Sequence, residues 1–283
     1  MSRDRLEGRV AVISGAGSGI GRALAVRLSA IGCPVALTDW NDEGLQDTSR
    51  SLQGRPHLSR TLDVRDRDAQ LAWAEEVRSW ATTPVGAVIN NAGVVVSQYA
   101  ADAVHEDDEW LMDINFWGVV HGTHAFLPQL IAQRAGVIVN LSSVFGLVAF
   151  PTQSAYCASK FAVRGYTEAL RHELHGTGVR AVAVHPGGIN TPITRAGRVR
   201  IDALGNTDPE VFHQNFTTLA RTSPEKAAET IHLGIERRRA RILIGPDAQL
   251  INLLGSLMPV HYFDVIRPMM PVARKILTTL GTH

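Results

Sequence analysis

Short apolar runs rich in β-branched residues alternate with longer amphipathic stretches along most of the chain. Val137-Ile138-Val139 and Val182-Ala183-Val184 are continuously apolar, which is the pattern of strands buried on both faces of a sheet. Regular alternation of strand and helix patterns is typical of parallel βαβ units with right-handed crossovers. The pattern therefore predicts an α/β fold built on a single doubly wound parallel sheet.

The boundaries of the expected elements follow from the same pattern. The expected strands span residues 10–14, 34–38, 57–62, 87–90, 136–141, 179–184 and 241–244. The expected helices span residues 20–31, 43–52, 66–80, 107–133, 154–175 and 224–237. We therefore expect a Rossmann-like sheet of about seven strands with helices on both faces, in one domain over residues 1–245.

Composition excludes several classes of protein. Lys and Arg number 28 against 27 Asp and Glu, so the net charge of +1 lacks the basic field of a typical nucleic-acid-binding protein. Two cysteines, Cys33 and Cys157, cannot form a disulfide scaffold, and no Cys-x-x-Cys pair is present. Among the eleven histidines, His172 and His175 stand three residues apart on an expected helix, which we interpret as an exposed pair and not as a zinc site. We expect a cytoplasmic protein without a signal peptide, a metal or a nucleic-acid partner.

A glycine-rich loop joins the first expected strand to the first helix. Its sequence is Gly15-Ala16-Gly17-Ser18-Gly19-Ile20-Gly21. Glycines permit a tight turn and close backbone approach to a pyrophosphate, and the amides at the helix start bind its charge. Asp39 ends the second strand, where an acidic residue accepts hydrogen bonds from ribose hydroxyls and repels a 2′-phosphate. Because its neighbours Thr38 and Trp40 are not basic, we expect NAD rather than NADP.

A tyrosine and a lysine share one face of an expected helix. Tyr156 and Lys160 stand four residues apart, which places a phenol beside an ammonium group. A nearby cation stabilises phenolate, so we expect a lowered pKa for Tyr156 and a role as general acid or base. Ser143 ends the fifth strand, and strand ends line the ligand crevice of a doubly wound sheet. The two side chains can therefore converge there.

Together these features resemble the compact, one-domain branch of the short-chain dehydrogenase/reductase family, over about residues 8–245. The motifs that carry the resemblance are Gly15-x-x-x-Gly19-x-Gly21, Asp39, Asp63-Val64, Asn90-Asn91-Ala92-Gly93, Asn115, Ser143, Tyr156-x-x-x-Lys160 and Pro186-Gly187 with Thr191.

The resemblance implies roles for individual residues. Tyr156 would protonate a carbonyl or deprotonate an alcohol, and Lys160 would bind the nicotinamide ribose and lower the tyrosine pKa. Ser143 would hold the substrate oxygen, and Asn115 would hold the water of a proton relay. The implied cofactor-binding residues are Gly15, Gly17, Ser18, Gly19, Ile20, Gly21, Asp39, Trp40, Asp63, Val64, Asn90, Ala92, Gly93, Tyr156, Lys160, Pro186, Gly187, Ile189 and Thr191.

The reaction that follows is hydride transfer between NAD(H) and a secondary alcohol or ketone. The loop 144–151 and the run Val94-Val95-Val96 are apolar, which favours a lipophilic substrate, although these residues could instead only pack the crevice wall. Residues 190–223 are expected to form a mobile substrate lid. The alternatives are a non-catalytic dinucleotide sensor and an epimerase or dehydratase. Family members are commonly dimers or tetramers, so we expect a homo-oligomer.

Residues 246–283 extend beyond the family pattern. Residues 248–263 contain no Asp, Glu, Lys or Arg, but the run is too short to span a membrane and includes Pro259. Three interpretations remain open: helices that cover the substrate pocket or a subunit interface, contact with a membrane surface, or a flexible segment. The first is favoured.

Overall fold

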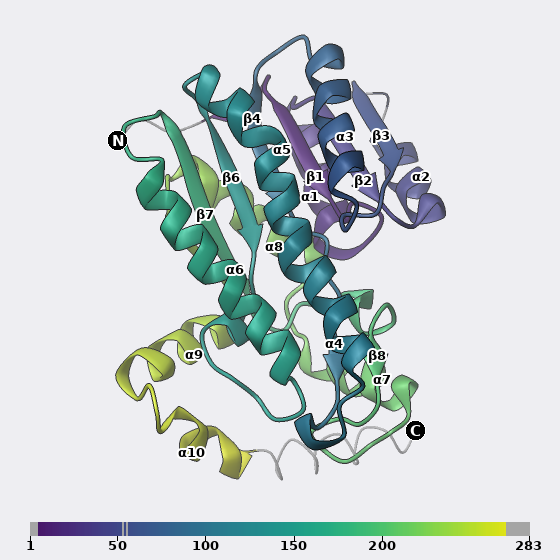
Figure 1. Ribbon diagram of the computed structural model, residues 1–283, viewed down its shortest axis with the longest axis vertical. Helices are drawn as coiled ribbons and strands as arrows, with labels where there is room; N and C mark the ends of the chain where they lie inside the picture. The colour runs from purple at the N-terminus through teal and green to yellow at the C-terminus, as the bar shows by residue number, and fades with distance from the viewer. Residues whose placement is uncertain (1–4, 53, 55, 270–283) are drawn as a thin grey trace.

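Seven parallel strands form the centre of the fold in the computed structural model, which describes residues 5–52, 54 and 56–269. The strands are β1 (Val10–Ser14), β2 (Val35–Asp39), β3 (His57–Thr61), β4 (Val85–Asn90), β6 (Gly136–Leu141), β7 (Val179–Pro186) and β9 (Arg241–Ile244). Their order is β3-β2-β1-β4-β6-β7-β9, and each pair is parallel. The expected doubly wound, Rossmann-like sheet is confirmed (Figure 1).

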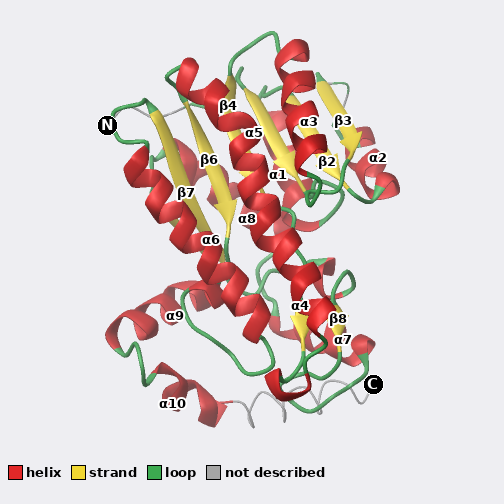
Figure 2. Cartoon of the chain, in the orientation of Figure 1, coloured by secondary structure: helices red, strands yellow, loops and turns green. Residues whose placement is uncertain are grey.

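Helices cover both faces of this sheet. One face carries α1 (Gly19–Ala30) and α8 (Pro224–Glu236), and the other carries α3 (Arg67–Trp80), α5 (Gly118–Ala132) and α6 (Ser154–Glu173). At the edge, α2 (Asp42–Arg50) connects β2 to β3. The layers are visible in Figures 1 and 2.

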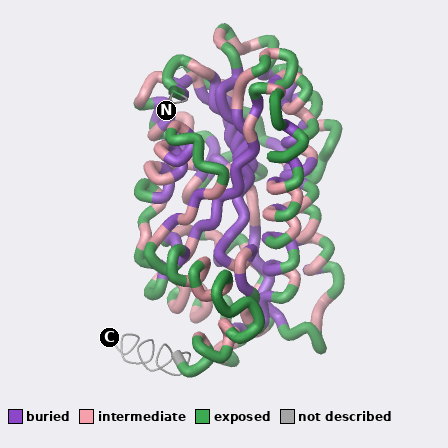
Figure 3. Tube along the Cα trace, turned by 90° about the vertical axis from the view of Figure 1, so that its left-hand side faces the viewer, coloured by how far each residue is buried: buried purple, intermediate pink, exposed green. Residues whose placement is uncertain are grey.

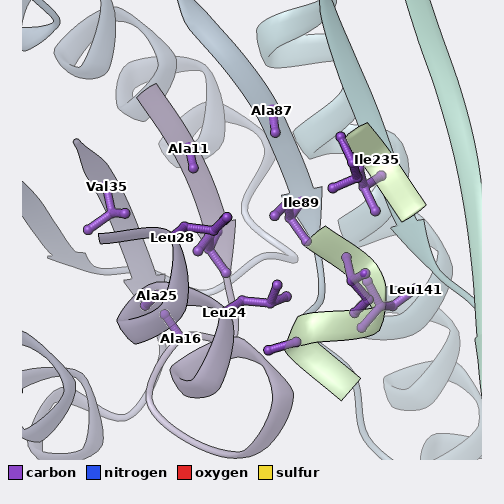
Figure 4. Close-up of a cluster of buried hydrophobic side chains, with 14 of the residues drawn as sticks. Ala11, Ala16, Leu24, Ala25, Leu28, Val35, Ala87, Ile89, Leu141 and Ile235 are labelled. Atoms are coloured by element: carbon purple, nitrogen blue, oxygen red, sulfur yellow. The ribbon is translucent and has the colours of Figure 1, made fainter. Parts of the chain in front are cut away.

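Strand residues alternate between two apolar cores. In β1, Ala11 and Ile13 belong to the core on the α1 side, whereas Val10 and Val12 belong to the core on the α3 side. Figure 4 shows the first core, where Leu24 and Leu28 of α1 lie close to strand side chains. Successive side chains of a strand point to opposite faces, so a strand that is covered on both faces must be apolar throughout. The buried strands run through the middle of the molecule in Figure 3.

The expected helix over residues 107–133 is interrupted. The structure has α4 (His105–Met112), then a π-helical turn η2 (Asp113–Trp117), then α5. Asn115, in the π-turn, accepts a hydrogen bond from the Val94 amide at 2.8 Å and donates to the Val94 carbonyl at 2.9 Å. Hydrophobic periodicity does not reveal a π-helical turn, because the turn adds one residue to the helix and changes the apolar pattern only slightly. Turns of this kind occur frequently at functional sites.

The segment 190–223 contains more regular structure than the sequence suggests. A short strand β8 (Arg198–Val199) pairs in parallel with β5 (Val96–Ser97), and α7 (Pro209–Leu219) follows. Asp208 caps α7 by accepting from the Glu210 amide at 2.8 Å. An Asp followed by Pro at the first helical position is a helix-start signal that the sequence contains. The short 3₁₀ turns are η1 (Ala100–Asp102), η3 (Val144–Gly146) and η4 (Pro192–Thr194).

The C-terminal extension is helical where it is described. It consists of α9 (Pro246–Leu257), α10 (Tyr262–Ile266) and the 3₁₀ turn η5 (Arg267–Met269), and it lies below the sheet at the lower left of Figure 1. This confirms the expected helical tail; its residues 270–283 lie outside the described part. Within the described part of the chain, every helix is too short or too polar to cross a bilayer.

Candidate active site

One large cavity opens at the carboxyl ends of the parallel strands. Its volume is about 930 Å³, within the range of small-molecule sites. Parallel strands end at the same edge of the sheet, so the loops that follow them meet there. The expected residues that line this cavity are Gly15, Gly17, Ser18, Gly19, Ile20, Asp39, Trp40, Asp63, Val64, Ala92, Gly93, Ser143, Tyr156, Lys160, Pro186, Gly187, Ile189 and Thr191.

The glycine loop is packed too closely for side chains. A Cβ on Gly21 would lie 2.0 Å from the Gly15 carbonyl oxygen, so Gly21 lies beneath the cavity rather than at its wall. Gly15 has φ +66°, in the left-handed region that favours glycine. The helix α1 starts directly after, at Gly19, so its unpaired first-turn amides lie at the cavity. This backbone cradle fits a pyrophosphate.

Asp39 lies next to this loop. Its Oδ2 accepts a hydrogen bond from the Gly17 amide at 2.7 Å, and its Oδ1 accepts from the Asn41 amide at 2.9 Å. A Cβ on Gly17 would lie 2.8 Å from the Asp39 Cγ, so the glycine permits this approach. The carboxylate is therefore held rigidly at the end of β2, beside the cavity.

Asp63 forms an ion pair with Arg65, which was not among the residues expected from the sequence. The Arg65 guanidinium binds Asp63 Oδ2 through Nη2 at 2.6 Å and through Nε at 2.9 Å, and Arg65 also lines the cavity. Burial acts to raise the pKa of Asp63, but the hydrogen bonds and charge of Arg65 outweigh it and hold that pKa below its ordinary value. Arg65 is only two positions after Asp63 in the sequence, which could have indicated the pair.

Tyr156 and Ser143 converge, from α6 and the end of β6. Both side chains line the cavity, the Ser143 hydroxyl acts to lower the pKa of Tyr156, and Ser143 Oγ accepts from the Phe145 amide at 3.1 Å. Lys160 donates from Nζ to the Leu141 carbonyl at 3.2 Å, and its Nζ lies 5.6 Å from the centre of the Tyr156 ring. A phenol, a hydroxyl and an ammonium group thus share one end of the cavity.

The expected lowering of the Tyr156 pKa by Lys160 is wrong for this structure. Burial raises the pKa of Tyr156 to about 12, with the Ser143 hydrogen bond acting in the opposite direction. Burial also lowers the pKa of Lys160 to about 8. Desolvation disfavours the charged form of both groups. Spacing along a helix places the two groups together but does not reveal how deeply they are buried.

Two expected residues lie behind the cavity wall. Asn115 is fully buried: it holds the Val94 backbone, and its Nδ2 donates to Ser159 Oγ at 3.2 Å. Asn90 donates to Asn140 Oδ1 at 2.8 Å, beneath the wall. Its neighbour Asn91 lines the cavity instead and donates to the Gly15 carbonyl at 3.0 Å. Asn115 and Asn90 therefore position the loops that form the site.

The other end of the cavity is apolar. Phe145 lies edge-to-face with Tyr156, with ring centres 6.2 Å apart, and stacks on Phe150 at 5.5 Å. Arg195 also lines the cavity, with its guanidinium 3.3 Å from Glu210 and 3.0 Å from His213. The apolar side chains of this wall include Val94, Val95, Trp110, Ile114, Val144, Phe145, Phe150, Ile193, Phe212, Phe216, Leu219 and Ile251.

An ion cluster anchors the segment 190–223 to α4. The buried Asp107 accepts from Arg198 at 2.7 Å and from Arg200 at 3.0 Å. The Arg198 guanidinium also lies 4.0 Å from the centre of the Trp110 ring, which lines the cavity. The sequence does not indicate this cluster, because Arg198 and Arg200 are 91 and 93 residues from Asp107.

The two cysteines, Cys33 and Cys157, are free and do not line the cavity. Burial raises the pKa of Cys33 to about 12, and it also raises the pKa of Cys157. Thiols of this kind are inert. In the part of the chain that the structure describes, no group of three or more His, Cys, Asp or Glu side chains could hold a metal ion.

Comparison with known proteins identifies the family. The family model described as short chain dehydrogenase matches residues 9–200. The chain belongs to the short-chain dehydrogenase family. Members of this family are oxidoreductases that use NAD or NADP.

The similarity to individual relatives extends over nearly the whole chain. The protein named SadH of Mycobacterium tuberculosis is 46% identical over 262 residues, 90% of this chain and 93% of that protein. The 2-(R)-hydroxypropyl-CoM dehydrogenase of Xanthobacter autotrophicus is 38% identical, over 90% of this chain and 98% of that protein. A short-chain dehydrogenase/reductase from Burkholderia phymatum, solved in complex with NAD, is similar with a TM-score of 0.80 at 31% identity. That match covers 89% of this chain and 94% of the other.

Proposed function

We propose that this protein transfers a hydride between NAD(H) and a lipophilic secondary alcohol or ketone, with Tyr156 as general acid or base. The observation that carries the proposal is the position of Tyr156. It lies with Ser143 in the same cavity that has the glycine loop at one end and an apolar wall at the other. A reactive phenol between a dinucleotide cradle and an apolar chamber fits this reaction.

NAD is the proposed cofactor. The cradle made by Gly15, Gly17 and Gly19 would hold the pyrophosphate, and Asp39 would accept hydrogen bonds from the adenosine ribose. A fixed carboxylate at this point would repel the 2′-phosphate of NADP. The solved relative with bound NAD supports the choice. Bound NAD supplies the hydride acceptor for oxidation and its reduced form the hydride donor for reduction.

The proton is handled by residues of the chain. In reduction the Tyr156 hydroxyl donates its proton to the substrate oxygen, and in oxidation the Tyr156 phenolate accepts the alcohol proton. Ser143 donates a hydrogen bond to that oxygen and orients it. Lys160, when protonated, stabilises the phenolate by its charge and binds the nicotinamide ribose. Asn115 acts by holding Val94 and the π-turn in place.

The apolar wall supports a lipophilic substrate. Phe145, Phe150 and Phe212 bring large apolar surfaces to the cavity, and burial of such surface against a substrate favours binding. Of the related proteins, one carries a name that describes dehydrogenation of a 2-hydroxypropyl group, which is a secondary alcohol. The complete set of Tyr156, Lys160 and Ser143 argues against a non-catalytic sensor, which needs none of them. Two other features argue against an epimerase or dehydratase of the extended branch, because such chains usually carry a different glycine spacing and a larger C-terminal domain. This chain has Gly15-x-x-x-Gly19-x-Gly21 and only a short extension after residue 245.

We also propose a role for each part of the chain. Residues 1–245 act as the catalytic domain, residues 190–223 as its substrate lid, and residues 246–283 as an extension. We propose a cytoplasmic homodimer or homotetramer. Exposed aromatic side chains on neighbouring helices, Trp117 beside α5 and Phe161 on α6, support a subunit contact there.

A substrate panel tests the proposed function. Purified protein is assayed with secondary alcohols of increasing apolar size and with small charged hydroxy acids, following NADH formation from NAD and NADPH formation from NADP. We expect kcat/KM to rise with apolar size and to be higher with NAD. A preference for charged hydroxy acids contradicts the substrate class. Complete inactivity in both directions, while NAD binds normally, favours the sensor instead.

A further inference from the structure

The C-terminal extension contacts both sides of the cavity. At its start, Asp247 Oδ2 accepts a hydrogen bond from the Gly188 amide at 2.7 Å, in the loop after β7 where the implied cofactor-binding residues Gly187 and Ile189 lie. In the middle of α9, Ile251 lines the cavity itself. At its far end, α10 reaches the loop 144–151, which follows Ser143. The extension therefore crosses the mouth of the site from the cofactor side to the substrate side.

The helix α9 lies very close to the loop 144–151. A Cβ on Gly255 would lie 2.9 Å from Val148 Cγ1 and 3.4 Å from the Leu147 carbonyl oxygen. Glycine within a helix is unfavourable relative to alanine. Here the missing side chain permits the close approach.

Tyr262 forms the polar end of the contact. Its hydroxyl accepts a hydrogen bond from the Ala149 amide at 2.8 Å and lies 3.4 Å from the Ala149 carbonyl, to which it donates. One hydroxyl therefore satisfies both backbone groups of an exposed loop residue that is 113 positions away in the sequence. A loop without such a partner would bond to water and move more freely.

Phe263 begins a row of aromatic contacts that leads to the catalytic tyrosine. Its ring lies edge-to-face with Phe150 at 6.2 Å. Phe150 stacks on Phe145 at 5.5 Å, and Phe145 lies edge-to-face with Tyr156 at 6.2 Å. Aromatic pairs in these arrangements favour one relative orientation of the rings. The position of Phe145, which forms the wall next to Tyr156, is therefore coupled to the extension.

We propose that Tyr262 and Phe263 are positioning residues that determine substrate specificity, because they hold the loop 144–151 and its wall of phenylalanines beside Tyr156. Residues 246–269 thus act as a strap, and the substrate it selects is a secondary alcohol whose apolar part reaches Phe145 and Phe150. This consequence rests on the proposed function. The mechanical part, that Tyr262 orders the loop, stands on the contacts alone.

Hydrogen–deuterium exchange tests the mechanical part. We compare wild type with Tyr262→Phe, which removes both hydrogen bonds and keeps the ring, and with Phe263→Leu. Tyr99→Phe is the matched control, since Tyr99 is an exposed tyrosine outside the cavity wall. We expect exchange in a peptide over residues 144–151 to be about two- to tenfold faster in Tyr262→Phe, as the loss of a net hydrogen bond implies. Equal exchange in wild type and both extension variants overturns the proposal.

Steady-state kinetics test the consequence for specificity. In Tyr262→Phe and Phe263→Leu we expect KM to rise about two- to tenfold for a bulky apolar secondary alcohol. For a short alcohol, KM and kcat are expected to stay close to wild type, as is the affinity for NAD measured by titration. A general loss of fold would instead lower Tm and affect both alcohols alike, and that result contradicts a specificity role. If wild type oxidises no alcohol, the proposed function fails, whereas the exchange experiment still decides whether the strap orders the loop.

Discussion

Lys160 Nζ lies 5.6 Å from the centre of the Tyr156 ring and donates a hydrogen bond to the Leu141 carbonyl at 3.2 Å. Both side chains are buried, and burial moves their pKa values in opposite directions, to about 12 for Tyr156 and about 8 for Lys160. Near neutral pH the pair therefore consists of a protonated phenol and a lysine that still carries its charge for most of the time. This arrangement is prepared to donate a proton from Tyr156 and to stabilise the phenolate that remains.

Replacing Tyr156 with Phe removes the acid–base group and keeps the ring. We expect kcat to fall about 10²- to 10⁴-fold, because a positioned proton donor or acceptor typically contributes that much. Tm and the dissociation constant for NAD, measured by calorimetric titration, are expected to change little. The assay is NADH absorbance with the best alcohol of the panel. Full activity in Tyr156→Phe contradicts the assignment of Tyr156 as general acid or base.

The raised pKa of Tyr156 gives the two directions of the reaction different pH profiles. Oxidation needs the phenolate, whose fraction increases as pH rises toward about 12, so kcat/KM for the alcohol is expected to rise with pH. Reduction needs the protonated phenol and the charge of Lys160, so it is expected to be high at neutral pH and to fall as pH rises above about 8, where Lys160 loses its proton. Initial rates in both directions over a pH series check this. Oxidation that declines from neutral pH upward contradicts it.

Replacing Asp39 with Asn removes one charge and keeps an acceptor for the Gly17 amide. A hydrogen bond to a charged group contributes roughly 1.5–3 kcal/mol. We therefore expect the ratio of kcat/KM for NAD to that for NADP to fall on the order of 10- to 100-fold. Asp47→Asn, at an exposed position paired with Arg50, is the control and should leave the ratio unchanged. An unaltered ratio in Asp39→Asn shows that another group selects the cofactor.

His185 makes the protein sensitive to acid. It is fully buried at the end of β7, and its Nδ1 lies 2.9 Å from the Ser143 carbonyl, to which it donates. Burial lowers the pKa of His185 from 6.5 to about 4; the Ser143 hydrogen bond opposes this shift, and the charges of Arg241 and Arg164 add to it. Below pH 6.5 the unfolded chain takes up a proton that the folded chain excludes. Stability contributed by the neutral imidazole is thus complete above pH 6.5 and is lost as pH falls toward 4.

We expect this group to lower the free energy of unfolding by roughly 3 kcal/mol between those two pH values. Urea denaturation over a pH series measures it, with His185→Gln as the test and His172→Gln, at an exposed position, as the control. The test variant should lose most of the acid dependence assigned to this residue. An equal dependence in wild type and His185→Gln means that other groups cause it.

Much of the fold was predictable, because strands and helices follow from the local pattern of apolar and polar residues. The strands at Gly136–Leu141 and Arg241–Ile244 have the expected bounds, since each is a short apolar run bounded by polar residues or turns. The local pattern did not predict the π-helical turn at Asp113–Trp117. In this turn Asn115 is hydrogen-bonded to the Val94 backbone, which is distant in the sequence. Of the candidate site, the sequence indicated the glycine loop, Asp39, Ser143, Tyr156 and Lys160, which lie beside one cavity.

The sequence alone determined which segments become strands and helices and which chemical groups stand at the strand ends. Periodicity and glycine spacing are local properties, so they can be read without coordinates. Only the tertiary structure decided which distant groups meet: Asp107 with Arg198, and Ala149 with Tyr262. It also decided the sign of the Tyr156 pKa shift, because desolvation depends on everything that surrounds the phenol and not on its neighbour in the helix.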